Sequence, residues 1–446
     1  MSRPRFSTLF AAAVVALAAL LAAAAVLLGS AASTRSAGAK TVVTVRLWDE
    51  QVAAAYRQSF AVFNRTHPDI EVRANVVAYA TYFDTLRTDV AGGGADDIFW
   101  LSNAYLAGYA DNGRLMKIDA TGADWEPSVV AQFSRGGTLW GVPQLTDAGI
   151  AVYYNVDLLA AAGVDRAELA GLRWDPHGAT DTLRPLLAKL TRDTAGRSAD
   201  TPGFDERRIR QWGYNAANDP QGIYLNYIGS AGGVFQRGDE FAFDNPGAVA
   251  AFSYLVELIN DDHVAPPASD TNTNGDFSRN QFLAGKMALF QSGTYNLAAI
   301  AEQAGFDWGV TMLPRGPEGD RVSVTNGIAA VGNAGSPHPE AVRQVLAWLG
   351  SREGNQYLGR QGGAAIPAVL GAQQVYFDYW AHRGIDVSPF FAVLNGRRIA
   401  APGGGQGFPA GNQAIKPYFD EMFLGRADVA TTLRRAQAAA NAAARR

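Results

Sequence analysis

The spacing of hydrophobic residues between positions 41 and 113 constrains the fold more than any other feature of the chain. Residues 41–48 form an apolar strand pattern, and the apolar side chains of the next stretch recur every three or four residues, as on one face of a helix. A second strand pattern at 70–76, a second helical stretch that ends at Gly92-Gly93-Gly94, and a short apolar run at 97–101 follow. Strands separated by helices predict an α/β fold with a doubly wound parallel sheet.

Polar and aromatic side chains follow the first and third of these expected strands. Trp48, Asp49 and Glu50 stand at the end of the first strand, and Ser102 and Asn103 stand at the end of the third. Open parallel sheets bind ligands outside the carboxyl ends of their strands, so these five residues are predicted to line a binding cleft. The alternative is that the carboxylate, hydroxyl and amide groups cap the helices that follow them.

Size, charge and composition narrow the function. At 446 residues the chain is too long for one hydrophobic core, so two or three domains are expected. The net charge of −4 and the absence of a dense basic cluster argue against a nucleic-acid partner. The chain has no cysteine, which excludes disulfides, thiolate metal ligands, a cysteine nucleophile and an acylated cysteine. Its five histidines lack metal-ligand spacing, so neither a metal nor a cofactor is expected.

The first forty residues read as a segment that directs or anchors the chain. Arg3 and Arg5 precede an unbroken apolar run, Leu9–Leu28, and small polar residues follow it. Basic residues before an apolar stretch predict that the chain begins in the cytoplasm and that its body lies outside. The run is long enough to span a bilayer, so both a cleaved signal and a retained membrane anchor stay open. Residues 1–40 are therefore expected to be a signal or anchor segment with its linker, and the rest of the chain extracytoplasmic.

Several motifs, in a fixed order along the chain, together resemble one protein family. They are Phe60-Ala-Val-Phe-Asn-Arg-Thr-His-Pro-Asp-Ile70, Ala95-Asp-Asp-Ile-Phe99, Leu139-Trp-Gly-Val-Pro143 with Val152-Tyr-Tyr-Asn155, Phe282-Leu-Ala-Gly-Lys-Met-Ala-Leu289, Gly293-Thr-Tyr295, Ser336-Pro-His-Pro-Glu-Ala341 and Gly362-Gly-Ala-Ala-Ile-Pro367. The chain in this respect resembles the extracellular solute-binding proteins of bacterial ABC importers, in particular the carbohydrate-binding group that includes maltodextrin-binding protein. Relatives are often lipoproteins, and the lack of a cysteine departs from that pattern.

The resemblance implies a periplasmic-binding-protein fold, with two α/β lobes joined by a hinge and the ligand cleft between the lobes. By analogy, residues 41–150 plus 307–350 form lobe 1, and residues 151–306 plus 351–446 form lobe 2. It also implies a monomer without catalytic residues, which captures a mono- or oligosaccharide or an amino sugar. The sugar would pass to the transmembrane subunits of an ABC permease.

Further site residues follow from the same resemblance. Tyr295 stands where relatives usually carry a tryptophan that stacks on the sugar, and Tyr224 lies in a part of lobe 2 where relatives also place aromatic residues. For both tyrosines, core packing is the alternative. The remaining candidates lie between the crossing strands, in the returning strand of lobe 1 and in glycine-rich loops: Asp147, Asn326, Gly363 and Phe408.

Two other functions stay open at this point. An exported enzyme that acts on glycosides would need two carboxyl groups about 5–10 Å apart across a cleft. The same fold could also be tuned to a non-sugar solute, such as a glycerophosphodiester, a polyamine or iron. No His-Glu-x-x-His motif is present, and Ile228 replaces the first glycine of the nearest match to a nucleophile elbow, so the sequence gives catalysis little support.

Overall fold

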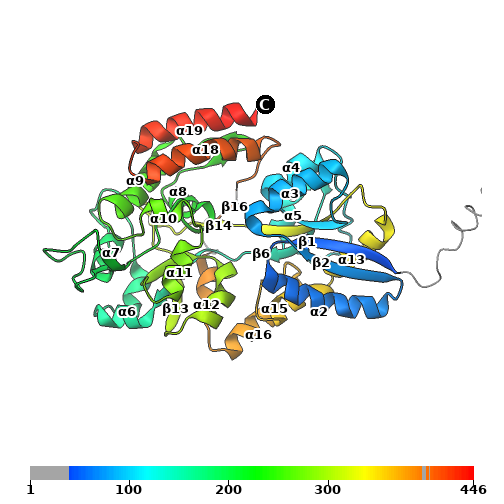
Figure 1. Cartoon of the computed structure of the whole chain (residues 1–446), viewed down its shortest axis with the longest axis horizontal. Helices are drawn as coiled ribbons and strands as arrows, with labels where there is room; N and C mark the ends of the chain where they lie inside the picture. Colours follow the sequence, from blue (N-terminus) through cyan, green and yellow to red (C-terminus); the bar gives the residue numbers. More distant parts are fainter. Residues whose placement is uncertain (1–39, 394–397, 401, 446) are drawn as a thin grey trace, which may run out of the picture.

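The chain forms two lobes side by side along the longest axis of the molecule (Figure 1). The computed structural model describes residues 40–393, 398–400 and 402–445. The expected signal or anchor segment, including Leu9–Leu28, therefore lies outside the described residues apart from Lys40. Within the described part of the chain, no helix combines the length and apolar character needed to cross a membrane.

Lobe 1 is built on a five-stranded sheet whose first three strands in sequence are parallel, as predicted. In spatial order its strands are β2 (Ile70–Val76), β1 (Thr41–Leu47), β3 (Ile98–Ser102), β15 (Gly327–Gly332) and β6 (Val142–Thr146). Strand β15 runs antiparallel to both of its neighbours. The predicted crossover helices are α2 (Glu50–Thr66) and α3 (Tyr79–Gly92), and α4 (Asn103–Ala110) and α13 (Pro339–Leu349) add to the same lobe.

Lobe 2 surrounds a smaller, three-stranded antiparallel sheet. Its strands are β12 (Leu289–Ser292), β7 (Ala151–Asn155) and β13 (Trp308–Met312), with β7 in the centre. The main helices are α7 (Leu183–Leu190), α8 (Leu225–Ser230), α9 (Pro246–Asn260), α11 (Phe277–Leu283), α18 (Phe408–Phe423) and α19 (Val429–Ala444). Helix α9 begins at Pro246 because Asn245 caps it, with Oδ1 accepting from Ala248 N (3.0 Å), and Pro246 fits its first turn.

Two segments lie in the other lobe from the one expected. Strand β13, within the expected lobe 1 segment 307–350, pairs with β7 in the sheet of lobe 2. Leu358 and Ala368, within the expected lobe 2 segment 351–446, are buried in the core of lobe 1. The hydrophobic pattern of a strand shows that it pairs but not which distant strand it pairs with, so the analogy alone could not place these segments.

Two adjacent crossings between the lobes lie where β6 leads to β7 and where β14 (Ser323–Thr325) leads to β15, and a third follows Ala368. The two crossing segments are hydrogen-bonded to each other: Asp147 N donates to Asn326 O (2.9 Å), and Ile150 N donates to Ser323 Oγ (2.7 Å). Strand β16 (Arg398–Ala400) pairs in parallel with β14 beside them. These paired crossings form the hinge expected between the lobes.

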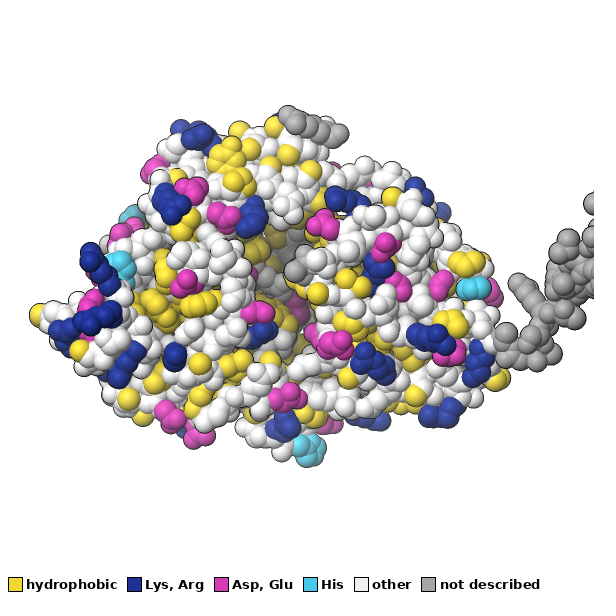
Figure 2. Space-filling view, in the orientation of Figure 1, with side chains coloured by type: hydrophobic (Ala, Val, Ile, Leu, Met, Phe, Trp, Pro, Cys, Tyr) yellow, Lys and Arg dark blue, Asp and Glu magenta, His cyan; other side chains and the backbone are white. Residues whose placement is uncertain are grey.

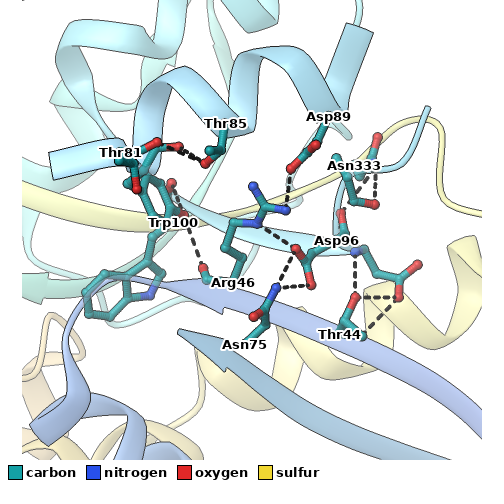
Figure 3. Close-up of polar contacts among 12 residues, drawn as sticks. Thr44, Arg46, Asn75, Thr81, Thr85, Asp89, Asp96, Trp100 and Asn333 are labelled. Carbon is teal, nitrogen blue, oxygen red and sulfur yellow. Dashed lines mark hydrogen bonds and ion pairs between the residues drawn. The ribbon is translucent and has the colours of Figure 1, made fainter. Parts of the chain in front are cut away.

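An ionic network around the buried Arg46 and Asp96 links elements of lobe 1 (Figure 3). Arg46 of β1 binds Asp96 through Nε and Asp89 of α3 through Nη2, both at 2.6 Å, and Asn75 of β2 donates to Asp96. Burial alone would lower the pKa of Arg46, but the two aspartates outweigh it and raise that pKa. The network ties two strands and a helix together just before β1 ends and Trp48 begins the cleft-facing segment.

Candidate functional site

A cavity of about 550 Å³ lies between the two lobes at the hinge. Figure 2 shows the surface hollowed at this position. The volume falls within the range of small-molecule sites, about 300–1,000 Å³. The residues that follow β1, together with residues of α3 and β3, form the wall of lobe 1. Residues 219–221, 279 and 294–296 of lobe 2 form the other wall, and the crossing strands form the floor.

Six of the residues predicted from the sequence line this cavity: Trp48, Asp49, Ser102, Asp147, Tyr295 and Asn326. The residues that follow β1 and β3 come together because parallel strands end at one edge of the sheet. Tyr295 reaches the same space from lobe 2, and Asp147 and Asn326 reach it from the hinge.

Glu50 and Asn103 lie beside the cavity lining, on helices that begin at the same edge. Glu50 stands on the exposed side of the first turn of α2, where its carboxylate lies 3.4 Å from Arg57 Nη2. Asn103 is the first residue of α4, and its backbone packs against Gly403. The side chains of successive residues point in different directions, so only one residue of each pair, Asp49-Glu50 and Ser102-Asn103, lines the cavity.

The other three candidates are packed inside the protein. Tyr224 is 4% exposed and Phe408 is 7% exposed, and both rings belong to the core of lobe 2. Gly363 adopts a φ of +58° against the rings of Tyr379 and Trp380, where a side chain would not fit. Tyr224 therefore follows the alternative stated for it, core packing, and Phe408 is packed in the same core.

Asp49 combines the two roles that the sequence left open. Its Oδ1 accepts from Gln51 N (2.8 Å) and Val52 N (3.0 Å), so it caps α2. The same carboxyl group lines the cavity, and its burial raises its pKa despite the two hydrogen bonds.

Two tyrosines present their rings to the cavity from opposite lobes. Tyr79 of α3 is 64% exposed and Tyr295 is 41% exposed. Tyr79 makes an edge contact with Trp48, with ring centroids 5.7 Å apart. A Cβ added to Gly293 would come within 2.3 Å of the Tyr295 ring, so the ring lies directly over this glycine. Both rings are therefore held from behind while one face stays open to a ligand.

The charged groups of the cavity are three aspartates and one arginine: Asp49, Asp147, Asp219 and Arg279. Asp147 Oδ2 accepts from Gln221 Nε2 of lobe 2 (2.8 Å), and burial raises its pKa to about 6. Burial also raises the pKa of Asp219, whose Oδ1 accepts from Gly222 N. Arg279 lies 3.0 Å from Asp276, the residue before its helix, so a carboxylate outside the cavity lining already pairs with it.

The family model of the bacterial extracellular solute-binding proteins matches residues 48–356 of the chain. The chain belongs to this family. The stretch includes both crossing segments and most of the cavity lining, and the expected two-lobe fold of these binding proteins is confirmed by structures of the family.

Individual solute-binding proteins resemble the chain to different extents. The structure of M. tuberculosis UspC is 77% identical, covers 90% of this chain and 100% of its own, and superimposes with a TM-score of 0.74. The arabinooligosaccharide-binding protein of Bacillus subtilis is 24% identical over 344 residues, which are 74% of this chain and 72% of that protein. A probable ABC transporter-binding protein of Deinococcus radiodurans is 28% identical, and the match spans half of each chain.

Polar and aromatic cavity residues of this solute-binding protein that the sequence analysis did not predict include Tyr79, Asp219, Gln221 and Arg279. Tyr79 begins the helix after β2, so the strand-end rule applied to β1 and β3 would also have found it. Asp219 shows a local capping signature before Pro220, and it does cap a short helical turn, Pro220–Tyr224. Nothing local shows that this turn of lobe 2 faces lobe 1.

The described residues contain no group of three or more histidine, cysteine, aspartate or glutamate side chains arranged to hold a metal ion. The residues that line the cavity offer hydrogen bonding, aromatic stacking and charge, which suit reversible binding.

Proposed function

We propose that this solute-binding protein captures a carbohydrate outside the cytoplasmic membrane and delivers it intact to the transmembrane subunits of an ABC permease. One observation carries the proposal. The exposed large hydrophobic side chains of the described residues are Tyr79, Tyr295 and Leu370, and the two aromatic ones line the same cavity from opposite lobes. A sugar ring has apolar C–H faces, and open aromatic faces are what such a ring needs.

The polar residues around these rings match the hydroxyl groups at the edge of a sugar. Ser102 and Asn326 offer hydroxyl and amide groups from lobe 1 and the hinge, and Gln221 and Asn296 offer amides from lobe 2. About five or six neutral hydrogen bonds at ~1 kcal/mol each and one aromatic stack of about 2–3 kcal/mol would give about −8 kcal/mol, an affinity in the micromolar range. The relative in Bacillus subtilis is named for binding an arabinooligosaccharide, which supports the same ligand class.

The three cavity carboxylates favour some sugars over others. A protonated amine would offset the cost of burying Asp49, Asp147 or Asp219 as a charged group, so we propose that an amino sugar binds better than its neutral counterpart. A glycerophosphodiester would bring its negative charge towards these groups, and Arg279 alone would not offset them. The acidic lining therefore argues against the phosphodiester alternative.

Capture is proposed to work by closure of the hinge. A ligand that contacts Tyr79 and Ser102 of lobe 1 together with Tyr295 and Gln221 of lobe 2 binds both walls at once. Only contacts that differ between open and closed arrangements shift their balance, and contacts to both walls meet this condition.

We also propose that the chain acts as a monomer and that residues 1–40 direct it across the membrane or hold it there, as Arg3, Arg5 and the Leu9–Leu28 run suggest.

Calorimetry on the full-length chain with single ligands tests this function. The set comprises glucose, a disaccharide, glucosamine, a polyamine and a glycerophosphodiester, and the reaction mixtures are then analysed for products. Saturable binding of a sugar that is recovered unchanged is expected, with glucosamine bound more tightly than glucose. Binding of the phosphodiester alone, or release of a cleaved sugar, would replace this function with one of the two alternatives.

A further inference from the structure

A second contact joins the lobes outside the cavity. The segment Gly403–Phe408 leads into α18 of lobe 2, where Phe408 is buried against Phe241, with ring centroids 5.3 Å apart. The same segment touches α4 of lobe 1, whose residue Ala104 packs against the core of lobe 2. Figure 1 shows the start of α18 lying next to α4.

The polar part of the contact with lobe 1 is a hydrogen bond to an aspartate that is already bound by an arginine. Gln406 Nε2 donates to Asp111 Oδ2 (2.8 Å), at the carboxyl end of α4. Arg135 binds both oxygens of Asp111, with Nε and Nη2 each at 2.6 Å. The Arg135 bonds and then the Gln406 bond lower the pKa of Asp111, so its carboxylate is charged at neutral pH and a strong acceptor.

The other end of the segment is fixed to lobe 2. Gln236 Oε1 accepts from Gly403 N (3.0 Å) and Gly404 N (3.1 Å), and Gln236 Nε2 donates to Gly404 O (2.9 Å). Gly403 approaches α4 so closely that a Cβ would lie 2.8 Å from the backbone of Ala104. The segment is thus held by lobe 2 through Gln236 and contacts lobe 1 through the backbone of Gly403 and the side chain of Gln406.

We infer that Gly403–Phe408 is an interlobe strap and that Gln406 is a positioning residue, which holds the lobes in the arrangement where both walls face one cavity. Gln406 and Asp111 are not among the cavity-lining residues, so they affect a ligand only through the orientation of the lobes. Loss of the tie lowers the population of the facing arrangement, and the apparent affinity falls by the same factor. This effect on affinity rests on the proposed function.

The binding test compares two glutamines that make the same kind of bond. Gln406→Ala should raise the dissociation constant of the bound sugar about two- to tenfold, as expected for loss of one exposed hydrogen bond to a carboxylate. Gln374→Ala is the matched control, because Gln374 Nε2 also donates to an aspartate oxygen at 2.8 Å, but within α16 (Gln374–His382). The control should leave affinity unchanged, and Gln406→Ala should add nothing once Asp111→Ala is present.

A distance measurement decides the inference without any sugar. Because the chain has no cysteine, spin labels at Thr88→Cys on lobe 1 and Glu421→Cys on lobe 2 report one interlobe distance. Gln406→Ala should lengthen or broaden that distance distribution, whereas Gln374→Ala should not. An unchanged distribution in the Gln406→Ala chain would overturn the strap, even if the wild type binds sugar as proposed. A wild type that binds no sugar would overturn the proposed function but leave this measurement valid.

Discussion

Replacement of Tyr295 by alanine is the most direct test of the binding cavity. Tyr295 lies in the short helical turn η3 (Thr294–Asn296) that follows β12. Its ring rests on Gly293, and 41% of the residue is exposed. The ring faces the cavity and is absent from the buried residues of the three core clusters, so its removal should change binding far more than stability.

The expected loss follows from what a sugar would cover. Stacking on an aromatic face contributes about 1 kcal/mol beyond simple burial. Removing the open part of the ring from water adds about 1–2 kcal/mol at ~25 cal/mol per Å². Tyr295→Ala should therefore lose roughly 2–3 kcal/mol of binding free energy, which is a rise of about 30- to 150-fold in Kd.

Calorimetry with the sugar of the test set that binds the wild type measures this loss, and circular dichroism checks that the fold is kept. Tyr295→Phe retains the ring and should stay within about fivefold of the wild type, since it loses only one hydrogen bond. Tyr418→Ala, on α18 and outside the cavity lining, should leave Kd unchanged. A folded Tyr295→Ala chain with less than a threefold change in Kd would refute the assignment of Tyr295 as a stacking residue.

Three further predictions follow from single contacts. Arg46→Met should lower the free energy of unfolding by about 3–5 kcal/mol in urea titrations, because Asp96 would stay buried without its cation. The control is Arg73→Met, which breaks an exposed 2.7 Å pair with Glu71 and should barely move the urea midpoint. Gly293→Ala should weaken sugar binding in calorimetry while the thermal midpoint holds, because the new Cβ displaces the Tyr295 ring. Burial raises the pKa of Asp147 to about 6, so its protonated form contributes stability below about pH 4, and this contribution is lost as pH rises through 6. Asp147→Asn should therefore flatten the plot of thermal midpoint against pH between about pH 4 and 6. Equal slopes for the wild type and the variant in this range would contradict the prediction.

The local pattern of the sequence determined much of lobe 1. Two hydrophobic periods alternate within residues 41–113, and each depends only on neighbours a few positions away, so β1, α2, β2, α3 and β3 could be predicted. Parallel strands share one edge for their carboxyl ends, so the same pattern also predicted that Trp48, Asp49 and Ser102 lie together. The motifs that resemble solute-binding proteins extended this to two lobes and to Tyr295.

Only the tertiary structure decided what faces this edge. Asp219 and Gln221 reach the cavity because lobe 2 folds back over the hinge, and the pairing of β13 with β7 depends on strands more than a hundred residues apart. Tyr224 and Phe408 carry rings as suitable for stacking as that of Tyr295, but distant side chains enclose them. The burial of a side chain depends on contacts between residues remote in sequence, so only the tertiary structure shows it. The hydrophobic period depends on adjacent residues, so the sequence alone predicts it.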